Sequence, residues 1–222
     1  MLQKLFIFIK NDFLHLQKQI LLDTYLTIKS ISEGLYKEKG SRFIGYAFPL
    51  SSSEEIKAIL SDLQKQYHDA RHICYAYVTG FGSENYRVND NGEPSGTAGR
   101  PILGAIRSNN LTNVLVVVIR YFGGIKLGTS GLITAYKEAA EDAINNGTII
   151  EKIIERHYEV LFQYLQINEI MRILKELECT ILKQEFDINC SIQFKIRKND
   201  AERVEEKIQK TENTKLQFLV EK

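Results

Sequence analysis

The chain has 222 residues, more than the ~100–200 typical of one domain, so the length favours one large domain or two small ones. Its 44% hydrophobic and 26% charged residues, with 3 Pro and 14 Gly, exclude a disordered or collagen-like chain. The net charge of +1 argues against a protein that holds nucleic acid through a long-range field, although it leaves room for a local basic patch.

The first 22 residues are apolar without a clean period. The run Leu5–Ile9 is too short for an export signal or a membrane span, and Lys10 and Asp12 interrupt the pattern. No later stretch reaches ~18 uncharged apolar residues, so we expect no membrane segment. We interpret residues 1–22 as an extension outside either domain, compatible with a start codon assigned too early.

Residues 23–147 carry the pattern of a first domain. Turn-forming glycines and charges at Glu33–Gly40 separate two short strands, and Ser52 with Glu55 forms the pattern of a capping box. The continuous apolar run Asn113–Ile119 predicts a strand buried on both faces. In chain order we expect strands at 25–28 and 42–48, a helix at 53–67, strands at 72–79 and 86–89, a helix at 97–108, the strand at 113–119 and a helix at 132–146.

Glycine is absent after Gly147, which indicates a domain boundary near residues 147–155. Residues 150–222 then predict a strand at 158–162, a helix at 167–177, a hairpin about Asp187, a helix after Asp200, and a last strand with alternating Leu216, Phe218 and Val220. The order βαββαβ is that of the ferredoxin-like fold. That fold decides no function by itself.

Two Gly-rich segments are the main functional signal. Ten of the 14 glycines lie between Gly80 and Gly131, and five of the first domain's six arginines fall between Arg71 and Arg120. Asp90–Pro101 and Arg120–Gly131 each lead from a strand to a helix N-terminus, where free N–H groups favour an anion. The alternative is that these glycines only form tight turns. We predict an anion-binding or nucleic-acid-binding surface formed by Arg71, Gly96, Thr97, Arg100, Arg120, Gly123, Gly124, Lys126, Thr129 and Gly131, with Thr129 or Ser130 capping the second helix.

Other chemistry has less support. Neither segment matches a Walker loop or GxGxxG. His68 and His72 do not share a face, and Cys74 and Cys190 fit a core better than a nucleophile. Asp90 and Glu93 form either an acid–base pair or loop-organising carboxylates, and the second interpretation is favoured. We expect no metal, no cofactor and no catalytic residue, and three scattered cysteines fit a reducing cytoplasm.

Four segments resemble the YigZ/IMPACT family: ARHICYAYV (70–78), DNGEPSGTAGRP (90–101), VVVIRYFGGIKLGTSGL (116–132) and the following AYKEAAEDA. The resemblance runs from about Asp23 to the C-terminus. It implies a ribosomal-protein-type βαβ first domain similar to one domain of elongation factor G, and a ferredoxin-like second domain. It also implies a link to the regulation of translation with RNA or ribosome contact and no accepted catalysis.

These observations give an α+β protein of the cytoplasm that binds RNA or a ribonucleoprotein through the Arg and Gly loops of its first domain. We expect Arg120 to supply binding and little packing. Two alternatives stay open: a hydrolase or phosphotransfer enzyme that uses Asp90, Glu93 and Arg120, and a module that binds a protein partner of the translation machinery.

Overall fold

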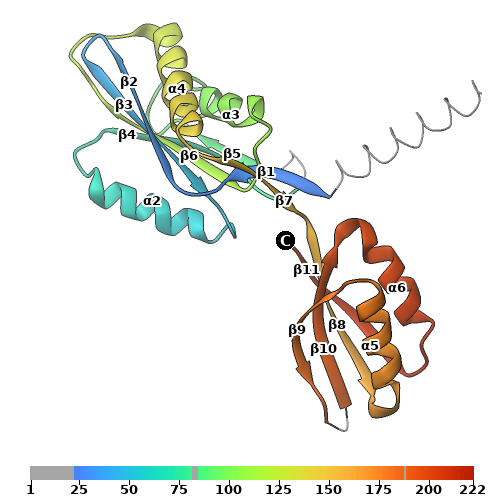
Figure 1. Cartoon of the computed structure of the whole chain (residues 1–222). Coiled ribbons are helices and arrows are strands. Elements are labelled where there is room, and N and C mark those ends of the chain that lie inside the picture. Colours follow the sequence, from blue (N-terminus) through green and yellow to red (C-terminus); the bar gives the residue numbers. More distant parts are fainter. Residues whose placement is uncertain (1–22, 82–84, 188) are drawn as a thin grey trace, which may run out of the picture. The chain divides into compact units, whose positions relative to one another are not determined.

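The computed structural model describes residues 23–81, 85–187 and 189–222. The proposed extension, residues 1–22, lies outside these ranges. The chain divides into two compact units. We call Tyr25–Lys152 the first unit, and Ile153–Lys222 with Asp23 and Thr24 the second unit. Each combines helices with a sheet, so the expected α+β class is confirmed (Figure 1).

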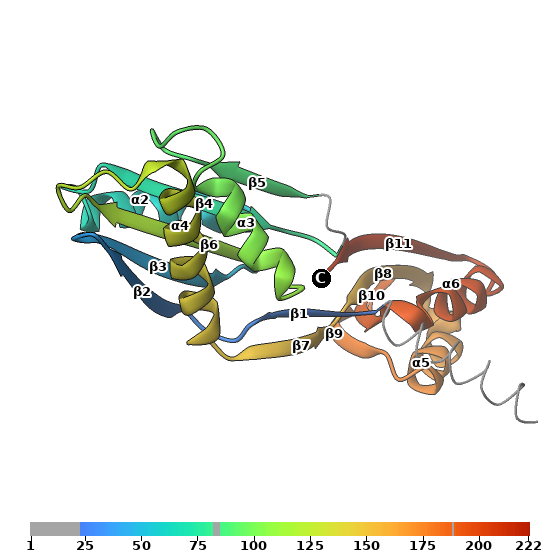
Figure 2. The same cartoon turned by 90° about the horizontal axis from the view of Figure 1, so that it is seen from above.

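A five-stranded sheet forms the centre of the first unit. Neighbouring strands are all antiparallel, in the order β2 (Ser32–Glu38), β3 (Ser41–Pro49), β6 (Val114–Tyr121), β4 (His72–Val78) and β5 (Tyr86–Asn89). Helix α2 (Glu55–Gln66) covers one face, and α3 (Gly99–Ser108) and α4 (Gly128–Asn145) cover the other (Figure 2). A separate two-stranded sheet pairs β1 (Thr24–Ile28) with β7 (Ile149–Ile153).

Strand β6 is buried on both faces, as its apolar sequence predicts. Val116 and Val118 belong to the core under α3 and α4, whereas Val117 and Ile119 belong to the core under α2. Alternate side chains of a strand point to opposite faces of its sheet, so a continuous apolar run serves both cores. The strand therefore fixes the position of the loops at its two ends.

The largest error in the expected elements is β2. Glu33–Gly40 was expected to be a turn, but most of it is a strand, and only Lys39 and Gly40 turn the chain, with φ of 47° and 79°. Gly34 serves packing here, since a Cβ built on it lies 2.3 Å from the Ala143 nitrogen of α4. A glycine selected for close approach has the same letter as one selected for a turn.

Two helix starts also differ from expectation. Helix α4 begins at Gly128, so Thr129 lies in its first turn and the expected capping by Thr129 or Ser130 is wrong. At α2 the expected box between Ser52 and Glu55 does not form, because the Glu55 carboxylate accepts the Ser51 N–H at 3.1 Å.

The second unit has the expected βαββαβ order. Its elements are β8 (Glu155–Gln163), α5 (Ile167–Glu176), β9 (Thr180–Glu185), β10 (Asn189–Arg197), α6 (Ala201–Gln209) and β11 (Thr214–Glu221), with short 3₁₀ turns at Tyr164–Gln166 and Lys198–Asp200. The antiparallel sheet order is β11-β8-β10-β9, and both helices pack in one core.

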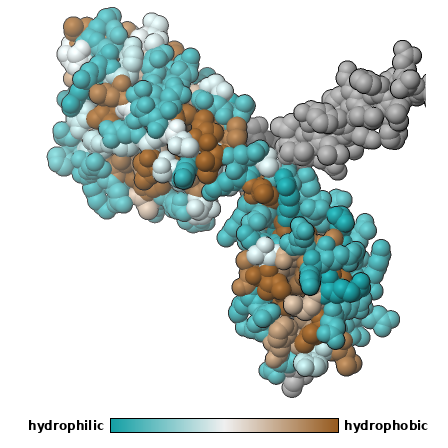
Figure 3. Space-filling model, in the orientation of Figure 1, coloured by the Kyte–Doolittle hydropathy of each residue, from teal (hydrophilic) through white to brown (hydrophobic). Residues whose placement is uncertain are grey.

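The edge strands of this unit leave apolar side chains in solvent. Ile181 and Leu182 of β9 are 36% and 49% exposed, and Figure 3 shows hydrophobic residues over this strand. On β11 the register shifts between Phe218 and Val220, so the expected alternation along the whole strand is wrong. Phe218 pairs with a core-facing residue of β8, whereas Val220 pairs with one on the open face.

Candidate functional site

Four loops of the first unit meet at one end of its sheet. Gly123 follows β6 and lies against the β2–β3 turn, since a Cβ built on Gly123 comes 1.9 Å from the carbonyl carbon of Gly40. The Tyr121 hydroxyl donates to Asp69 Oδ1 at 2.7 Å, which joins β6 to the α2–β4 loop. We call residues 37–42, 68–72, 90–98 and 122–131 the loop end.

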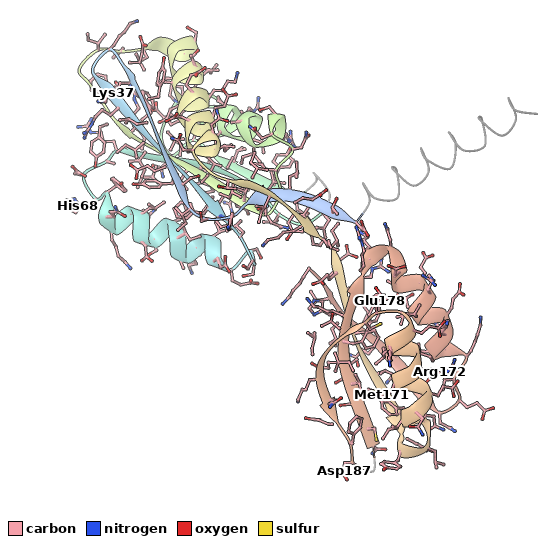
Figure 4. The ribbon with its side chains drawn as sticks, in the orientation of Figure 1. Lys37, His68, Met171, Arg172, Glu178 and Asp187 are labelled. Atoms are coloured by element: carbon pink, nitrogen blue, oxygen red, sulfur yellow. The ribbon has the colours of Figure 1, made fainter. Side chains whose placement is uncertain are left out.

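Figure 4 shows two of its basic side chains at the boundary with solvent. Lys37 lies near the β2–β3 turn, and His68 lies just after the end of α2. The loop of residues 90–98 is tied to the others through His72, whose Nδ1 lies 2.9 Å from the Asn91 carbonyl oxygen. Both Gly-rich segments identified in the sequence therefore belong to one surface.

The loop before α3 is organised by Asp90. Its Oδ1 accepts the N–H groups of Ala98 at 3.1 Å and Gly99 at 2.8 Å, and its Oδ2 accepts that of Gly96 at 2.8 Å. Gly96 adopts φ of 76°, which costs little only for glycine. Although partial burial opposes ionisation, the three N–H donors and the charge of Arg100 hold the pKa of Asp90 below its usual value.

This arrangement corrects the expectation of an anion site at the start of α3. The helix N-terminus already holds a carboxylate of the protein itself, so a phosphate meets an occupied position. Thr97 is 4% exposed, and its hydroxyl donates to the Pro94 carbonyl at 2.7 Å. Gly96 and Thr97 thus shape the loop rather than present groups to a ligand.

Arg120 lies inside the protein and not in a loop. Its side chain is 7% exposed, and its Nη1 donates to Glu93 Oε1 at 2.7 Å. The hydroxyl of Tyr136, from α4, donates to the same oxygen at 2.8 Å. The guanidinium also lies 5.5 Å from the ring centres of Phe43 and Phe122. The expectation that Arg120 contributes little packing is therefore wrong.

Cys74 lies next to the buried Glu93–Arg120 pair and contacts it through Tyr136. The Cys74 thiol donates to the Asp90 carbonyl at 2.9 Å and approaches the Tyr136 hydroxyl at 3.4 Å. Burial is the main reason that the pKa of this thiol rises to about 12, with Glu93 and Asp90 adding to the effect. Cys74 is fully buried, which confirms it as a core residue, and its raised pKa disfavours the thiolate at neutral pH.

Most of the β6–α4 loop faces solvent. Gly123, Gly124, Lys126 and Thr129 are exposed, and Gly131 is half-buried. The first turn of α4 contains no acidic residue, and the N-cap Leu127 makes no side-chain capping bond. This helix therefore keeps the partial positive charge of its N-terminus, in contrast to α3.

The loop end that contains this helix start also carries exposed cations. Five exposed lysines and arginines lie at the loop end, and within the described ranges none of them has a carboxylate oxygen within 4.0 Å: Lys37, Lys39, Arg42, Arg71 and Lys126. Phe122 and Ile125 stand among them, 53% and 57% exposed. Sequence reasoning found Arg71 and Lys126 but missed the other three and the two apolar residues. The segment YFGGIK, in which apolar residues flank a glycine pair after the predicted strand, was the available signal.

Arg100 is not one of these loop-end cations. It lies on the first turn of α3 and lines a groove between that helix and β5. In the described part of the chain, no group of three His, Cys, Asp or Glu is placed to hold a metal ion. Likewise, no described helix is long and apolar enough to cross a membrane.

The arrangement favours binding over catalysis. Asp90 is fully engaged with backbone N–H groups, and Glu93 is buried against Arg120 and Tyr136. Glu93 is not presented to solvent, and the half-buried Asp90 already accepts three N–H groups, so neither carboxylate is placed as a general base. The surface instead offers cations, a helix N-terminus and an exposed aromatic ring, which together suit an extended anion.

Comparison with known proteins gives the class of this chain. Residues 39–144 match the Impact N-terminal domain. A relative from Bacillus subtilis (strain 168), the IMPACT family member YvyE, is 32% identical over 181 residues, which cover 82% of this chain and 83% of that protein. The chain belongs to the IMPACT family.

Two solved structures extend the comparison. A crystal structure of a hypothetical protein matches with a TM-score of 0.66 and 27% identity, and it covers 89% of this chain and 97% of the other. The two-domain translational regulator Yih1 matches over 54% of this chain and 48% of its own, with a TM-score of 0.36 and 24% identity.

Proposed function

We propose that the loop end binds the phosphate backbone of RNA, free or within a ribonucleoprotein, and that the chain acts in the cytoplasm as a translation-associated regulator. The binding proposal is carried by two features of the loop end: five exposed lysines and arginines with no carboxylate oxygen within 4.0 Å in the described part of the chain, and the uncapped start of α4. The link to translation rests on membership of the IMPACT family. The fold alone supports neither statement.

The proposed contacts keep Arg71, Lys126 and Thr129 from the sequence-based expectation and leave out Gly96, Thr97 and Arg120, which are engaged inside the fold. Lys126 and Arg71 reach phosphates, and the N–H groups of Gly128 and Thr129 meet a phosphate at the start of α4. Phe122 offers a ring on which a base stacks, as in proteins that bind single strands. Gly124 keeps a side chain out of the path of the strand, since a Cβ built there projects into open space, whereas Gly123 lets the loop pack against the β2–β3 turn.

A salt titration tests this proposal. The affinity for a single-stranded RNA oligonucleotide should fall with salt, and each lost phosphate contact should reduce the log–log slope by about 0.7. Lys126→Gln and Arg71→Gln should each lower the slope by about that amount. Lys152→Gln is the matched control, because Lys152 is an exposed cation of the same unit that lies on β7, outside the loop end.

Phe122→Ala tests stacking separately from charge. It should weaken RNA binding by about 5- to 150-fold, the equivalent of ~1–3 kcal/mol for one stacked base, and it should leave the salt slope unchanged. The proposal fails if the wild-type chain shows no salt-dependent affinity tighter than the nonspecific range of ~10⁻⁴ to 10⁻⁶ M.

A further inference from the structure

A second feature of the first unit is a groove between the edge strand β5 and helix α3. It has a volume of about 430 Å³, within the ~300–1,000 Å³ common for ligand pockets. Six residues line it: Tyr86, Val88, Arg100, Leu103, Gly104 and Arg107. Figure 2 shows β5 at the margin of the sheet with α3 beside it. The groove thus has a strand for one wall and a helix for the other.

The free edge of β5 offers backbone groups to a partner. The Thr79 N–H donates to the Asn85 carbonyl, and Tyr77 pairs with Arg87. Backbone groups of an antiparallel strand alternate in direction, so those of Tyr86 and Val88 face away from β4. Within the described residues no strand occupies that side of β5. The side chains of the same two residues line the groove.

The helical wall supplies charge. Arg100 and Arg107 are exposed and lie seven residues apart on α3, about 10.5 Å along its axis. In the described part of the chain neither has a carboxylate oxygen within 4.0 Å. The Arg107 guanidinium stands 4.4 Å from the centre of the Tyr86 ring, which holds it over the groove.

We propose that this groove binds an acidic, extended peptide segment of a protein partner, which adds to β5 as a further strand. Main-chain hydrogen bonds form to Tyr86 and Val88, and alternate Asp or Glu side chains pair with Arg100 and Arg107. Side chains at positions i and i+2 of a strand lie about 6.8 Å apart. Those at i, i+2 and i+4 therefore cover about 13.6 Å, enough to span the distance between the two arginines. Gly104 leaves the space between them open, since a Cβ built there meets nothing within 4 Å.

A peptide fits this groove better than a nucleic acid does. Within the described residues the outer edge of β5 is unpaired, and its N–H and C=O groups are matched by a peptide backbone and not by a phosphodiester one. The site is separate from the RNA surface proposed above and does not depend on it.

The test uses the full chain and a fluorescein-labelled capped peptide, Glu-Val-Glu-Val-Glu-Val. Anisotropy should show saturable binding below about 1 mM. The backbone amide signals of Tyr86 and Val88 should shift in NMR spectra. The charge-reversed peptide Lys-Val-Lys-Val-Lys-Val should not bind. A Glu-Val peptide with N-methylated valine amides should bind at least tenfold more weakly, because it lacks the N–H donors of strand pairing.

Two variants locate the site. Gly104→Glu places a negative charge between the arginines, and Arg107→Gln removes one of them, so each should weaken binding of the Glu-Val peptide at least tenfold. Gly104→Ala is the control for Gly104→Glu and should bind normally. Lys126→Gln and Phe122→Ala should also bind the peptide normally, so a failure of RNA binding leaves this result unaffected.

Several outcomes would overturn the proposal. These are no binding of the Glu-Val peptide, equal binding of the N-methylated peptide, or equal binding by Gly104→Glu. Two further results would also overturn it, because each identifies another occupant. One is an RNA oligonucleotide that shifts the Tyr86 and Val88 amides more strongly than the peptide does. The other is a shift of those amides with protein concentration alone, which indicates a second copy of the chain.

Discussion

Asp90 is the residue on which the geometry of the β5–α3 loop depends. Its carboxylate holds three backbone N–H groups and caps a helix that has no other acidic residue in its first turn. Such a cap stabilises by about 1 kcal/mol or more, with a further contribution from the charge at the helix N-terminus. The same carboxylate keeps Gly96 and the residues after it in the positions seen in the structure.

Asp90→Asn should lower the free energy of unfolding by about 1–2 kcal/mol near neutral pH. Because the pKa of Asp90 is depressed in the folded state, its stabilisation is complete above the unfolded pKa of ~3.9 and is lost as the pH falls through the folded value. Urea unfolding at several pH values checks this. A difference between wild type and variant that stays constant down to pH 2 would contradict it.

The Glu93–Arg120 pair is a second residue-level test, and it reverses the expectation from sequence. Arg120→Ala should leave the buried Glu93 carboxylate without its cation and cost about 3–5 kcal/mol. That loss corresponds to a melting temperature lower by roughly 10 °C. The double variant Glu93→Gln/Arg120→Met should recover part of it, since neither buried charge remains. An unchanged melting temperature of Arg120→Ala would refute the structural role.

The sequence did not distinguish these roles. Arg120 and Glu93 are 27 residues apart, and Tyr136 is 43 residues from Glu93, so their contact depends on how β6, α4 and the β5–α3 loop pack. A charged residue beside glycines has the same local pattern whether it binds a ligand or a partner inside the fold. For Asp90 the local pattern was sufficient, because its donors lie only six to nine residues ahead.

At the scale of elements, periodicity predicted most helices and strands because each buries one face. It failed where a glycine is present because the backbone of another element approaches closely. In β2, a Cβ built on Gly34 comes 2.3 Å from the Ala143 nitrogen of α4, and this glycine was interpreted as part of a turn. The helix lies equally close to β3, where a Cβ built on Gly45 comes 2.3 Å from the Ala139 carbonyl oxygen, although there the strand was predicted. The residues of the two strands do not by themselves indicate that a helix packs against them.

This packing predicts opposite effects for one substitution at two glycines. Gly45→Ala should destabilise the chain by about 1–3 kcal/mol, because the methyl group displaces α4. Gly104→Ala should stabilise it by about 0.5–1 kcal/mol, since Gly104 lies in the interior of α3 with open space around it. Thermal unfolding of both variants measures the two signs, and a stabilising Gly45→Ala would contradict the close contact.

For the whole molecule, the disappearance of glycine after Gly147 indicated two units, because the loops of the first unit need glycine and the short turns of the second do not. The structure adds a connection that no sequence pattern predicts. Asp23, at the start of the described chain, is fully buried and pairs with Arg197 of β10, with Nη2 at 3.0 Å from Oδ1. Its carbonyl also accepts the Ile154 N–H at 2.6 Å.

The second unit should therefore fold alone but with reduced stability when Asp23 is missing. A fragment of residues 150–222 has its own core and should unfold cooperatively. It should do so at a midpoint about 5–15 °C below that of the same unit in the full chain, since loss of the hydrogen bonds to Asp23 costs about 1–3 kcal/mol in a unit of this size.

Asp23→Asn in the full chain separates the lost contact from the effect of cutting the chain. It should lower the transition of the second unit in calorimetry and leave that of the first unit in place, because both partners of Asp23 belong to the second unit. A fragment that melts without a cooperative transition would show that the unit does not fold alone. A fragment with an unchanged midpoint would show instead that Asp23 contributes nothing measurable, and the buried ion pair would then be a consequence of the fold and not one of its supports.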